Sequence, residues 1–152
     1  MKTAFSVRRM RSADLPRILV IERASFGADA YDRNLFAEYA RDCGGLFLVA
    51  EAGTKVVGYA ITCIGGQPER IWGELVSLAV LPSVRGKGAA AALMNSILRR
   101  LRRRRIPKLA LTVKISNARA ISFYERYGFR RVRRIARYYE DAQDGWRYVK
   151  DL

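Results

Sequence analysis

The sequence predicts an α+β fold, of the broad α/β type, in which a mixed central sheet is flanked by helices. Three observations predict it. Segments with the apolar alternation of strands interleave with segments of helical spacing, and glycine or proline marks the joints between them. No repeat or low-complexity stretch interrupts this order, and the length of 152 residues suits a single domain over 1–152 with its own core.

The first half of the chain is expected to hold a strand, two helices and a hairpin. Ser12 is placed to cap the first helix and Asp32 the second, because both side chains accept hydrogen bonds from the first amides of a helix. Gly53 lies between two β-rich segments, which indicates a hairpin. The expected elements are a strand over 5–10, a helix to residue 26, a helix after residue 32, and strands over 46–51 and 55–64.

The second half is expected to alternate strands with helices and to end on two strands. Pro82 ends one strand and Pro107 breaks the long helix. Asn117 caps a short helix, and Gly128 supplies the left-handed residue at its end. The expected elements are strands over 71–81, 109–115, 129–138 and 146–152, with helices over 89–104 and 117–127. The last strand could pair within the chain or with a second copy, so monomer and homodimer both stay open.

The chain is strongly basic. Lys and Arg number 29 against 14 Asp and Glu, which gives a net charge of +15. A field of this sign favours anionic partners such as phosphates, RNA or acidic proteins. Six arginines crowd the segment Arg99–Arg105, and like charges this close repel one another. They form either a solvated face or a surface that contacts the ribosome or RNA.

Composition also argues against several other classes of protein. The chain has no His and no CxxC pair, so no metal site is expected. Cys43 and Cys63 lie far apart among apolar residues, and we expect both to be reduced core residues of a cytoplasmic protein. No apolar run reaches the roughly 18 residues that a membrane span needs, and the N-terminus has no signal-peptide core.

The segment over 76–94 carries the clearest functional pattern. An apolar strand leads through Pro82 into two glycines, Gly86 and Gly88, at the start of a helix. Glycine lets the backbone approach a ligand, and the first amides of a helix together with its dipole bind anions. Arg85 and Lys87 add positive charge, so a pyrophosphate fits. The spacing is neither GxxxxGK[ST] nor GxGxxG, and on its own it also suits an ordinary strand–helix turn.

Two blocks of sequence resemble the GNAT superfamily of N-acetyltransferases. RGKGAA at 85–90, after LAVLP, is similar to the [Q/R]-x-x-G-x-[G/A] signature. SNARAISFYERYGF at 116–129 is similar to the N-x-x-A-x-x-x-Y-x-x-x-G-F pattern. The order of elements matches over essentially the whole chain. Within the superfamily the chain most resembles the branch that acetylates N-terminal amines, typified by ribosomal-protein-alanine N-acetyltransferases, and Tyr138-Tyr139 fit that branch.

The resemblance implies acetyl-CoA as the cofactor and gives roles to the matching residues. Backbone amides of Arg85, Gly86, Lys87, Gly88, Ala89 and Ala90 would hold the pyrophosphate. The strand residues Leu78, Ala79 and Val80 would bind the pantetheine arm, and one of their amides would stabilise the thioester oxyanion. Asn117 would touch the cofactor arm in addition to capping its helix. Tyr124 would protonate the leaving thiolate, a role that a phenol with a pKa of about 10 can fill; the alternative for Tyr124 is aromatic packing.

The sequence departs from this branch at the general base. The strand before the Asn usually carries a Glu, but this chain has Thr112 there, and threonine is no base at neutral pH. Glu74 is the substitute that we predict; its alternatives are a solvent-facing strand residue or a water chain to backbone carbonyls. A weak base favours an acceptor of low pKa, because an α-amine (pKa ~8) is about 10% neutral at pH 7, whereas a lysine amine (~10.4) is below about 0.1%.

The predicted reaction is acetyl transfer to the α-amine of a protein or peptide N-terminus. Tyr31, Tyr138 and Tyr139 are candidates for lining the acceptor entrance, with edge packing as the alternative. A second hypothesis is a small-molecule amine as acceptor. A third is a basic domain that binds nucleic acid or the ribosome and retains a CoA site without catalysis.

Overall fold

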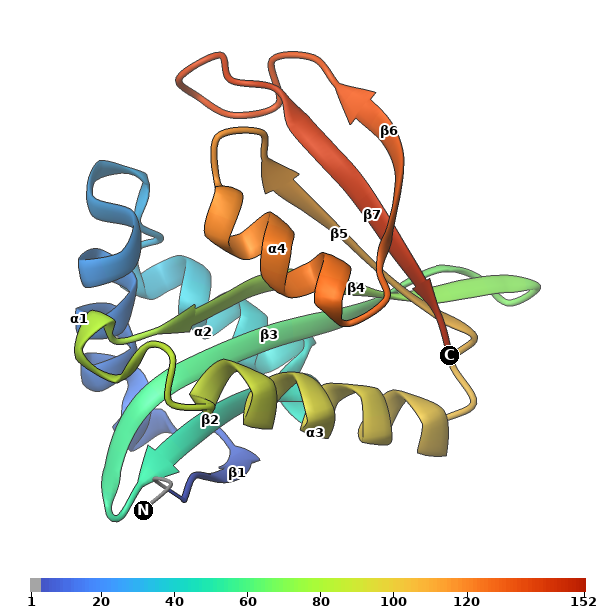
Figure 1. Ribbon diagram of the computed structural model, residues 1–152. Helices are drawn as coiled ribbons and strands as arrows, with labels where there is room; N and C mark the ends of the chain where they lie inside the picture. Colours follow the sequence, from blue (N-terminus) through green and yellow to red (C-terminus); the bar gives the residue numbers. More distant parts are fainter. Residues whose placement is uncertain (1–3) are drawn as a thin grey trace. The chain divides into compact units, whose positions relative to one another are not determined.

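The computed structural model describes residues 4–152, and the chain separates into two compact units. Unit 1 comprises the described part of Met1–Cys63 together with Ser77–Arg100, and unit 2 comprises Ile64–Val76 and Leu101–Leu152. The predicted order of elements is confirmed throughout, and the fold is the mixed α/β arrangement that the sequence predicts (Figure 1). One domain over 1–152 stays a prediction.

Unit 1 begins with strand β1 and the helices α1 and α2. The bounds are Ser6–Arg9 for β1, Leu15–Phe26 for α1 and Arg33–Asp42 for α2. Asp32 caps α2 as predicted, since its side chain accepts from the Leu35 amide at 2.9 Å. Ser12 does not cap α1: a 3₁₀ turn, Ser12–Asp14, comes first, and Asp14 accepts from the Arg11 amide instead. That prediction was wrong by one turn of chain.

The sheet of unit 1 has helices on both faces. Its strands are β1, β2 (Phe47–Ala52), β3 (Lys55–Gln67) and the end of β4 (Arg70–Val80). A Cβ on Gly58 of β3 would lie 3.3 Å from the Leu93 side chain of α3 (Ala89–Arg103). The following residue, Tyr59, has its ring centroid 5.4 Å from that of Phe36 of α2. Since neighbouring strand residues point to opposite faces, α3 covers one face, and α2 packs on the other with α1 (Figure 1).

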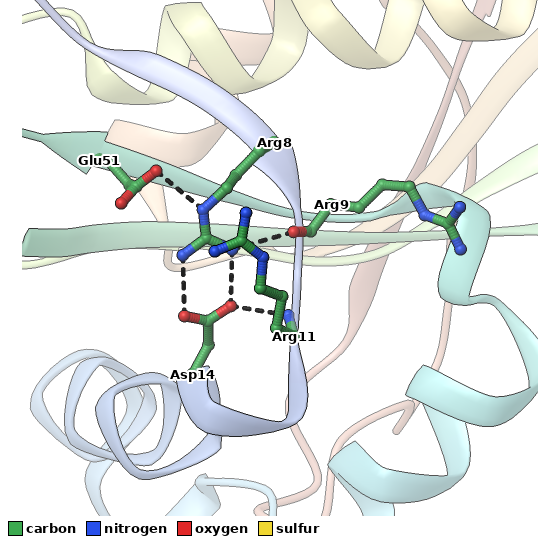
Figure 2. A network of polar contacts seen from close by, with 5 residues as sticks. All are labelled: Arg8, Arg9, Arg11, Asp14 and Glu51. Atoms are coloured by element: carbon green, nitrogen blue, oxygen red, sulfur yellow. Dashed lines mark hydrogen bonds and ion pairs between the residues drawn. The ribbon is translucent and has the colours of Figure 1, made fainter. Parts of the chain in front are cut away.

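An ion-pair network ties β1 to the start of α1 (Figure 2). The Arg8 guanidinium donates to both oxygens of Asp14 at 2.8 and 2.9 Å, and its Nε donates to Glu51 of β2 at 2.8 Å. Asp14 is buried. Arg8 holds the pKa of Asp14 below its usual value against the opposing effect of burial. The first strand is therefore fixed to both its neighbours by one cation.

The two cysteines correct a prediction. Cys43, at the end of α2, and Cys63 of β3 form a disulfide with 5.2 Å between their Cα atoms. Both are half-buried and belong to unit 1. They are neither reduced nor core residues. No local pattern indicates this pairing, because the two cysteines stand 20 positions apart and the chain between them includes the turn that returns the end of α2 to the sheet.

Unit 2 is a mixed sheet with helix α4 (Ala118–Arg126). Its strands are the first part of β4, β5 (Lys108–Lys114), β7 (Gly145–Asp151) and β6 (Arg130–Ile135). β4 pairs parallel to β5, whereas β7 runs antiparallel between β5 and β6. The last strand therefore pairs within the chain. Its fully buried Tyr148 donates to Glu125 of α4 at 2.7 Å, which fixes the helix to the sheet.

Candidate active site

The predicted pyrophosphate loop lies in unit 1, between β4 and α3. Gly86 and Gly88 have φ angles of 78° and 103°, a backbone region that side chains rarely adopt, so both positions require glycine. A Cβ there would meet nothing within 4 Å, and the loop is exposed. The amide of Ala92 makes the first helical bond, to the Gly88 carbonyl at 2.9 Å. The loop therefore leads directly into the N-terminus of α3, the end of a helix that favours an anion.

The charge around this loop also favours an anion. Lys87 is exposed beside the two glycines, and the first turn of α3 carries no acidic residue. The helix dipole places partial positive charge at the same end. The residues present therefore fit a bound pyrophosphate in charge, in backbone conformation and in open space.

The strand that precedes the loop is tightly packed. Ala79 and Val80 are buried and Leu78 is half-buried. A Cβ on Gly58 of β3 would lie 3.1 Å from the Ala79 carbonyl, so β3 and β4 lie close here. The strand end is held by a bond of 2.8 Å from the Leu81 amide to the Val57 carbonyl. A segment fixed in this way is a rigid support for groups that would bind a cofactor arm.

A buried polar network that the sequence analysis missed also lies in unit 1. Glu22 of α1 is 1% exposed, and its carboxylate accepts the amide of Tyr31 at 2.9 Å and the hydroxyl of Tyr59. The Tyr59 hydroxyl also contacts Ser77 Oγ at 2.8 Å. A sequence signal existed: Glu22 follows Leu15 by seven residues and Ile18 by four, which places it on the apolar face of the helix.

Tyr31 stands in the segment just before α2. The ring is half-buried and lies 5.8 Å from Phe36 and 6.2 Å from Tyr39. Its backbone is fixed by the bond to Glu22. Tyr31 is thus an aromatic side chain on a well-anchored segment, and its contact with an acceptor stays a prediction.

Tyr124 lies in unit 2 on the buried side of α4. Its ring packs edge-on against Phe129 at 5.6 Å and Phe123 at 5.4 Å. Burial raises the pKa of the phenol, so it stays protonated at neutral pH. Among residues 4–152 no group hydrogen-bonds the Tyr124 hydroxyl. A protonated phenol without an internal partner is able to donate to a ligand.

Asn117 stands at the N-terminus of α4, as predicted. Its side-chain oxygen accepts the Ala120 amide at 3.2 Å, and the residue is exposed. The capping role is confirmed, and contact with a cofactor arm stays a prediction.

Glu74 lies on β4 in unit 2 and has a partner that the sequence did not indicate. Arg147 of β7 donates to its two oxygens at 2.5 and 2.6 Å, and the Trp72 indole donates at 3.1 Å. The same guanidinium reaches Thr112 Oγ1 at 3.3 Å. Both carboxylate oxygens are occupied by charge-assisted bonds to one guanidinium, so neither is free to accept from an acceptor amine. This geometry does not favour Glu74 as a general base.

Tyr138 and Tyr139 form a pair in the turn between β6 and β7. The rings meet edge-on at 4.9 Å, and Tyr138 is 53% exposed. The Tyr139 hydroxyl donates to the Thr112 carbonyl at 3.4 Å, and Lys114 Nζ lies 5.2 Å from the ring centroid. In unit 2 the structure therefore brings Glu74 and Tyr139 together around Thr112.

The predicted residues divide between the two units. Unit 1 holds Tyr31, Leu78–Val80 and the loop over 85–90, and unit 2 holds Glu74, Asn117, Tyr124, Tyr138 and Tyr139. Within the described residues no group of three His, Cys, Asp or Glu side chains is arranged to hold a metal ion. None of the helices described between residues 4 and 152 is both long and apolar enough to cross a membrane.

Comparison with known proteins agrees with this geometry. The N-alpha-acetyltransferase of Saccharolobus solfataricus is 29% identical over 97% of this chain and 93% of its own length. Ard1 from Thermoplasma volcanium has the same fold, with a TM-score of 0.92 at 23% identity over 98% of both chains. The ribosomal-protein-S18-alanine N-acetyltransferase of Escherichia coli gives a TM-score of 0.83 at 25% identity, over 98% of this chain and 94% of its own.

The family itself is identified over most of the sequence. Residues 9–129 match the acetyltransferase (GNAT) family, and this stretch includes both blocks on which the resemblance rests, over 85–90 and over 116–129. The chain belongs to the GNAT family of acetyltransferases.

Proposed function

We propose that this protein transfers the acetyl group of acetyl-CoA to the α-amine of a protein or peptide N-terminus. The exposed glycine loop at the start of α3 is the observation that carries the proposal. Several solved structures that resemble this chain were crystallised with CoA or with bisubstrate analogues. The relative from S. solfataricus is an N-alpha-acetyltransferase, which supports an α-amine as the acceptor.

The cofactor would be held by the residues that the two sequence blocks mark. Amides of 85–90 would bind the pyrophosphate with help from the dipole of α3. The segment Leu78–Val80 and Asn117 would bind the pantetheine arm. When bound, acetyl-CoA supplies an activated acetyl thioester.

The residues of the chain would then stabilise the charges of acyl transfer. The neutral amine attacks the thioester carbonyl, and a fixed amide of Leu78–Val80 would stabilise the negative charge on the carbonyl oxygen. Tyr124 would donate its phenolic proton to the leaving thiolate. Because burial raises the pKa of Tyr124, this proton is in place at neutral and mildly alkaline pH, where the α-amine becomes neutral enough to attack.

The acceptor side of the proposal rests on three aromatic residues. Tyr31, Tyr138 and Tyr139 would line the entrance and contact the first residues of the peptide. A low-pKa α-amine needs less help from a base than a lysine side chain does. Glu74 as that base stays a prediction, and its ion pair with Arg147 does not favour it.

A contact with RNA or the ribosome is a second part of the proposal. Arg99 and the four arginines over 102–105 are exposed, and in the described chain no carboxylate pairs with any of these five. Unpaired guanidinium groups at this density favour phosphate.

The cytoplasm as the location also stays a prediction, and the Cys43–Cys63 disulfide does not favour it. Cell fractionation would test this location. Monomer and homodimer stay open.

Acetyl-CoA turnover, read as release of free thiol, tests the proposed function. The acceptors are peptides with free N-termini, the same peptides with blocked N-termini and an internal lysine, and small amines. We expect turnover on free N-termini alone. Preference for the lysine peptides would contradict the α-amine, and turnover on small amines alone would support the second hypothesis.

Tyr124→Phe is the matched variant for this assay. It removes one hydroxyl and keeps the ring that packs on Phe129. We expect kcat to fall about 100-fold with little change in KM, the scale typical of a lost general acid. Unchanged kcat would remove Tyr124 from the mechanism. CoA binding without turnover on any acceptor would favour the third hypothesis, a domain that keeps the site without catalysis.

A further inference from the structure

The network around Glu22 joins two segments of unit 1 to which the proposed function gives roles. At one end the Glu22 carboxylate accepts the amide of Tyr31, on the segment proposed to meet the acceptor. At the other end Ser77 directly precedes Leu78–Val80, the segment proposed to hold the thioester. Tyr59 joins the two ends, since its hydroxyl donates to Glu22 and lies 2.8 Å from Ser77 Oγ.

The network has one buried end and one end nearer to solvent. Glu22 is 1% exposed and Tyr59 is fully buried, whereas Ser77 is only half-buried. The Tyr59 hydroxyl proton is used in the bond to Glu22. In the contact with Ser77 the Tyr59 oxygen therefore accepts, and the Ser77 hydroxyl donates. The hydroxyl protons then point in one direction, from Ser77 to the carboxylate.

An ionised carboxylate in this position lowers the stability of the fold, which points to a functional role for the acid. Burying a charge without a cation carries a large desolvation penalty. The groups that face Glu22 are the Tyr59 hydroxyl from β3 and the Tyr31 amide. Among residues 4–152 no cation forms an ion pair with this carboxylate. A glutamine would satisfy the same two partners at lower cost, so packing alone does not explain the acid.

We propose that Glu22, acting through Tyr59 and Ser77, takes up the proton that the acceptor amine loses before it attacks the thioester. This inference rests on the proposed function. It assigns the role of general base, which Thr112 cannot play and for which the ion pair with Arg147 makes Glu74 unsuitable. It makes Glu22 a relay residue that does not itself touch the acceptor.

The proton balance of the step is closed. One N–H bond of the acceptor ammonium breaks and its proton goes to Ser77 Oγ, while the Ser77 hydroxyl proton passes to the Tyr59 oxygen. The Tyr59 proton passes to the carboxylate, which becomes a neutral acid, and the amine keeps its electron pair for attack. The proton later returns to solvent by the same groups in reverse. Burial raises the pKa of Glu22, which makes it a better proton acceptor than an exposed carboxylate.

Glu22→Gln tests the relay in the intact chain. Its amide oxygen can accept from Tyr31 and its NH₂ can donate to Tyr59, so the packing is kept and only proton uptake is lost. We expect kcat on N-terminal peptides to fall about 100-fold with KM nearly unchanged. The acid limb of the wild-type kcat/KM profile, set by ionisation of Glu22, should disappear from the variant. The control is Glu38→Gln, on the exposed side of α2 in the same unit, which should match the wild type.

Two further variants keep the inference testable if Glu22→Gln does not fold. Tyr59→Phe removes the middle hydroxyl and keeps the ring, and Ser77→Ala removes the outer one; each should lower kcat about tenfold or more and leave KM in place. A folded Glu22→Gln protein with wild-type kcat and an unchanged acid limb would overturn the relay. A rise in KM alone would do so too, because it would show that Glu22 only fixes Tyr31. Wild-type turnover, measured first, separates failure of the relay from failure of the proposed function.

Discussion

The role assigned to Glu74 changes once its partner in the structure, Arg147, is known. In the sequence it is an acid at the start of a strand, close to where a base is needed. In the structure both oxygens are bound by Arg147, which comes 73 positions later. No local pattern carries that information, because the pairing depends on the place of β7 beside β5.

We predict that Glu74→Gln lowers kcat by less than about threefold, because both carboxylate oxygens are already bound by the Arg147 guanidinium. It should lower the free energy of unfolding by about 1–2 kcal/mol, the usual scale of a lost charged hydrogen bond. Arg147→Gln should cost a similar amount, and the double variant should cost less than the sum. Steady-state kinetics and urea unfolding measure the two effects. A loss of kcat near that of Tyr124→Phe would restore Glu74 as the base.

Other single residues divide by the kind of signal that they carry. Asn117 was predictable as a cap because capping is local in sequence. Glu22 was predictable in principle, since an acid on an apolar helix face demands a partner. Cys43 and Cys63 were not, because pairing two cysteines needs the distance between the end of α2 and β3, and that distance follows from packing rather than from either residue.

The predicted order of helices and strands is confirmed, and the predictions differ from the structure in the residues at which individual strands end. β6 stops at Ile135, short of residue 138, because Arg137 takes a φ of 49° and its amide donates to Asp144. β3 runs on to Gln67, beyond the predicted end, since backbone pairing continues through glycines that carry no strand signal. In both cases hydrogen bonds to the chain that follows the strand, rather than the residues of the strand itself, decide where the element ends.

The joint between β1 and α1 provides a prediction about acid stability. Arg8 holds the pKa of Asp14 below 3.8, its ordinary value, in the folded state. The group therefore contributes stability that is present above that ordinary value and is lost as the pH falls through it toward the lower folded value. Asp14→Asn keeps an acceptor for the Arg11 amide and removes the charge. We expect it to lower the free energy of unfolding at pH 7 by about 1–3 kcal/mol.

Thermal unfolding over a pH series measures this effect. The wild type should lose stability more steeply than Asp14→Asn on the acid side of pH 3.8, so the two curves should converge there. Asp42→Asn is a suitable control, because its contact with Arg41 is exposed on both sides, at 70% and 66%. Parallel curves for Asp14→Asn and wild type would mean that the network in Figure 2 does not couple to folding.

At the scale of the whole molecule, sequence blocks and charge carry different amounts of information. Two short blocks, at 85–90 and 116–129, were enough to identify the family, because they mark a loop and a helix with fixed chemistry. They do not identify the acceptor, since the aromatic residues expected to meet it stand on turns whose conformation depends on distant contacts. The net charge, in contrast, follows entirely from composition, but composition does not show where on the surface the charged side chains lie.

The position of that charge leads to a prediction about RNA. The exposed arginines over 102–105 lie in the last turn of α3 and just after it. Those of β6 are partly neutralised, as Arg130 is by Asp151 and Arg134 by Asp144. The α3 cluster is therefore the better site for phosphate. We expect labelled single-stranded RNA to bind at low salt and to be released as salt rises, because each phosphate contact displaces counterions.

Replacing Arg102, Arg104 and Arg105 by Gln should weaken this binding and reduce the slope of log affinity against log salt by about 2, as expected for three lost contacts to a single strand. Fluorescence polarisation across a salt series gives both quantities. Acetyl transfer to a free peptide should be unchanged in the same variant, because these side chains lie outside the loop at 85–90 and away from Tyr124 in sequence and in role. Equal RNA affinity in wild type and variant would mean that the cluster is a solvated face, and that the +15 charge acts through the molecule as a whole rather than through one surface.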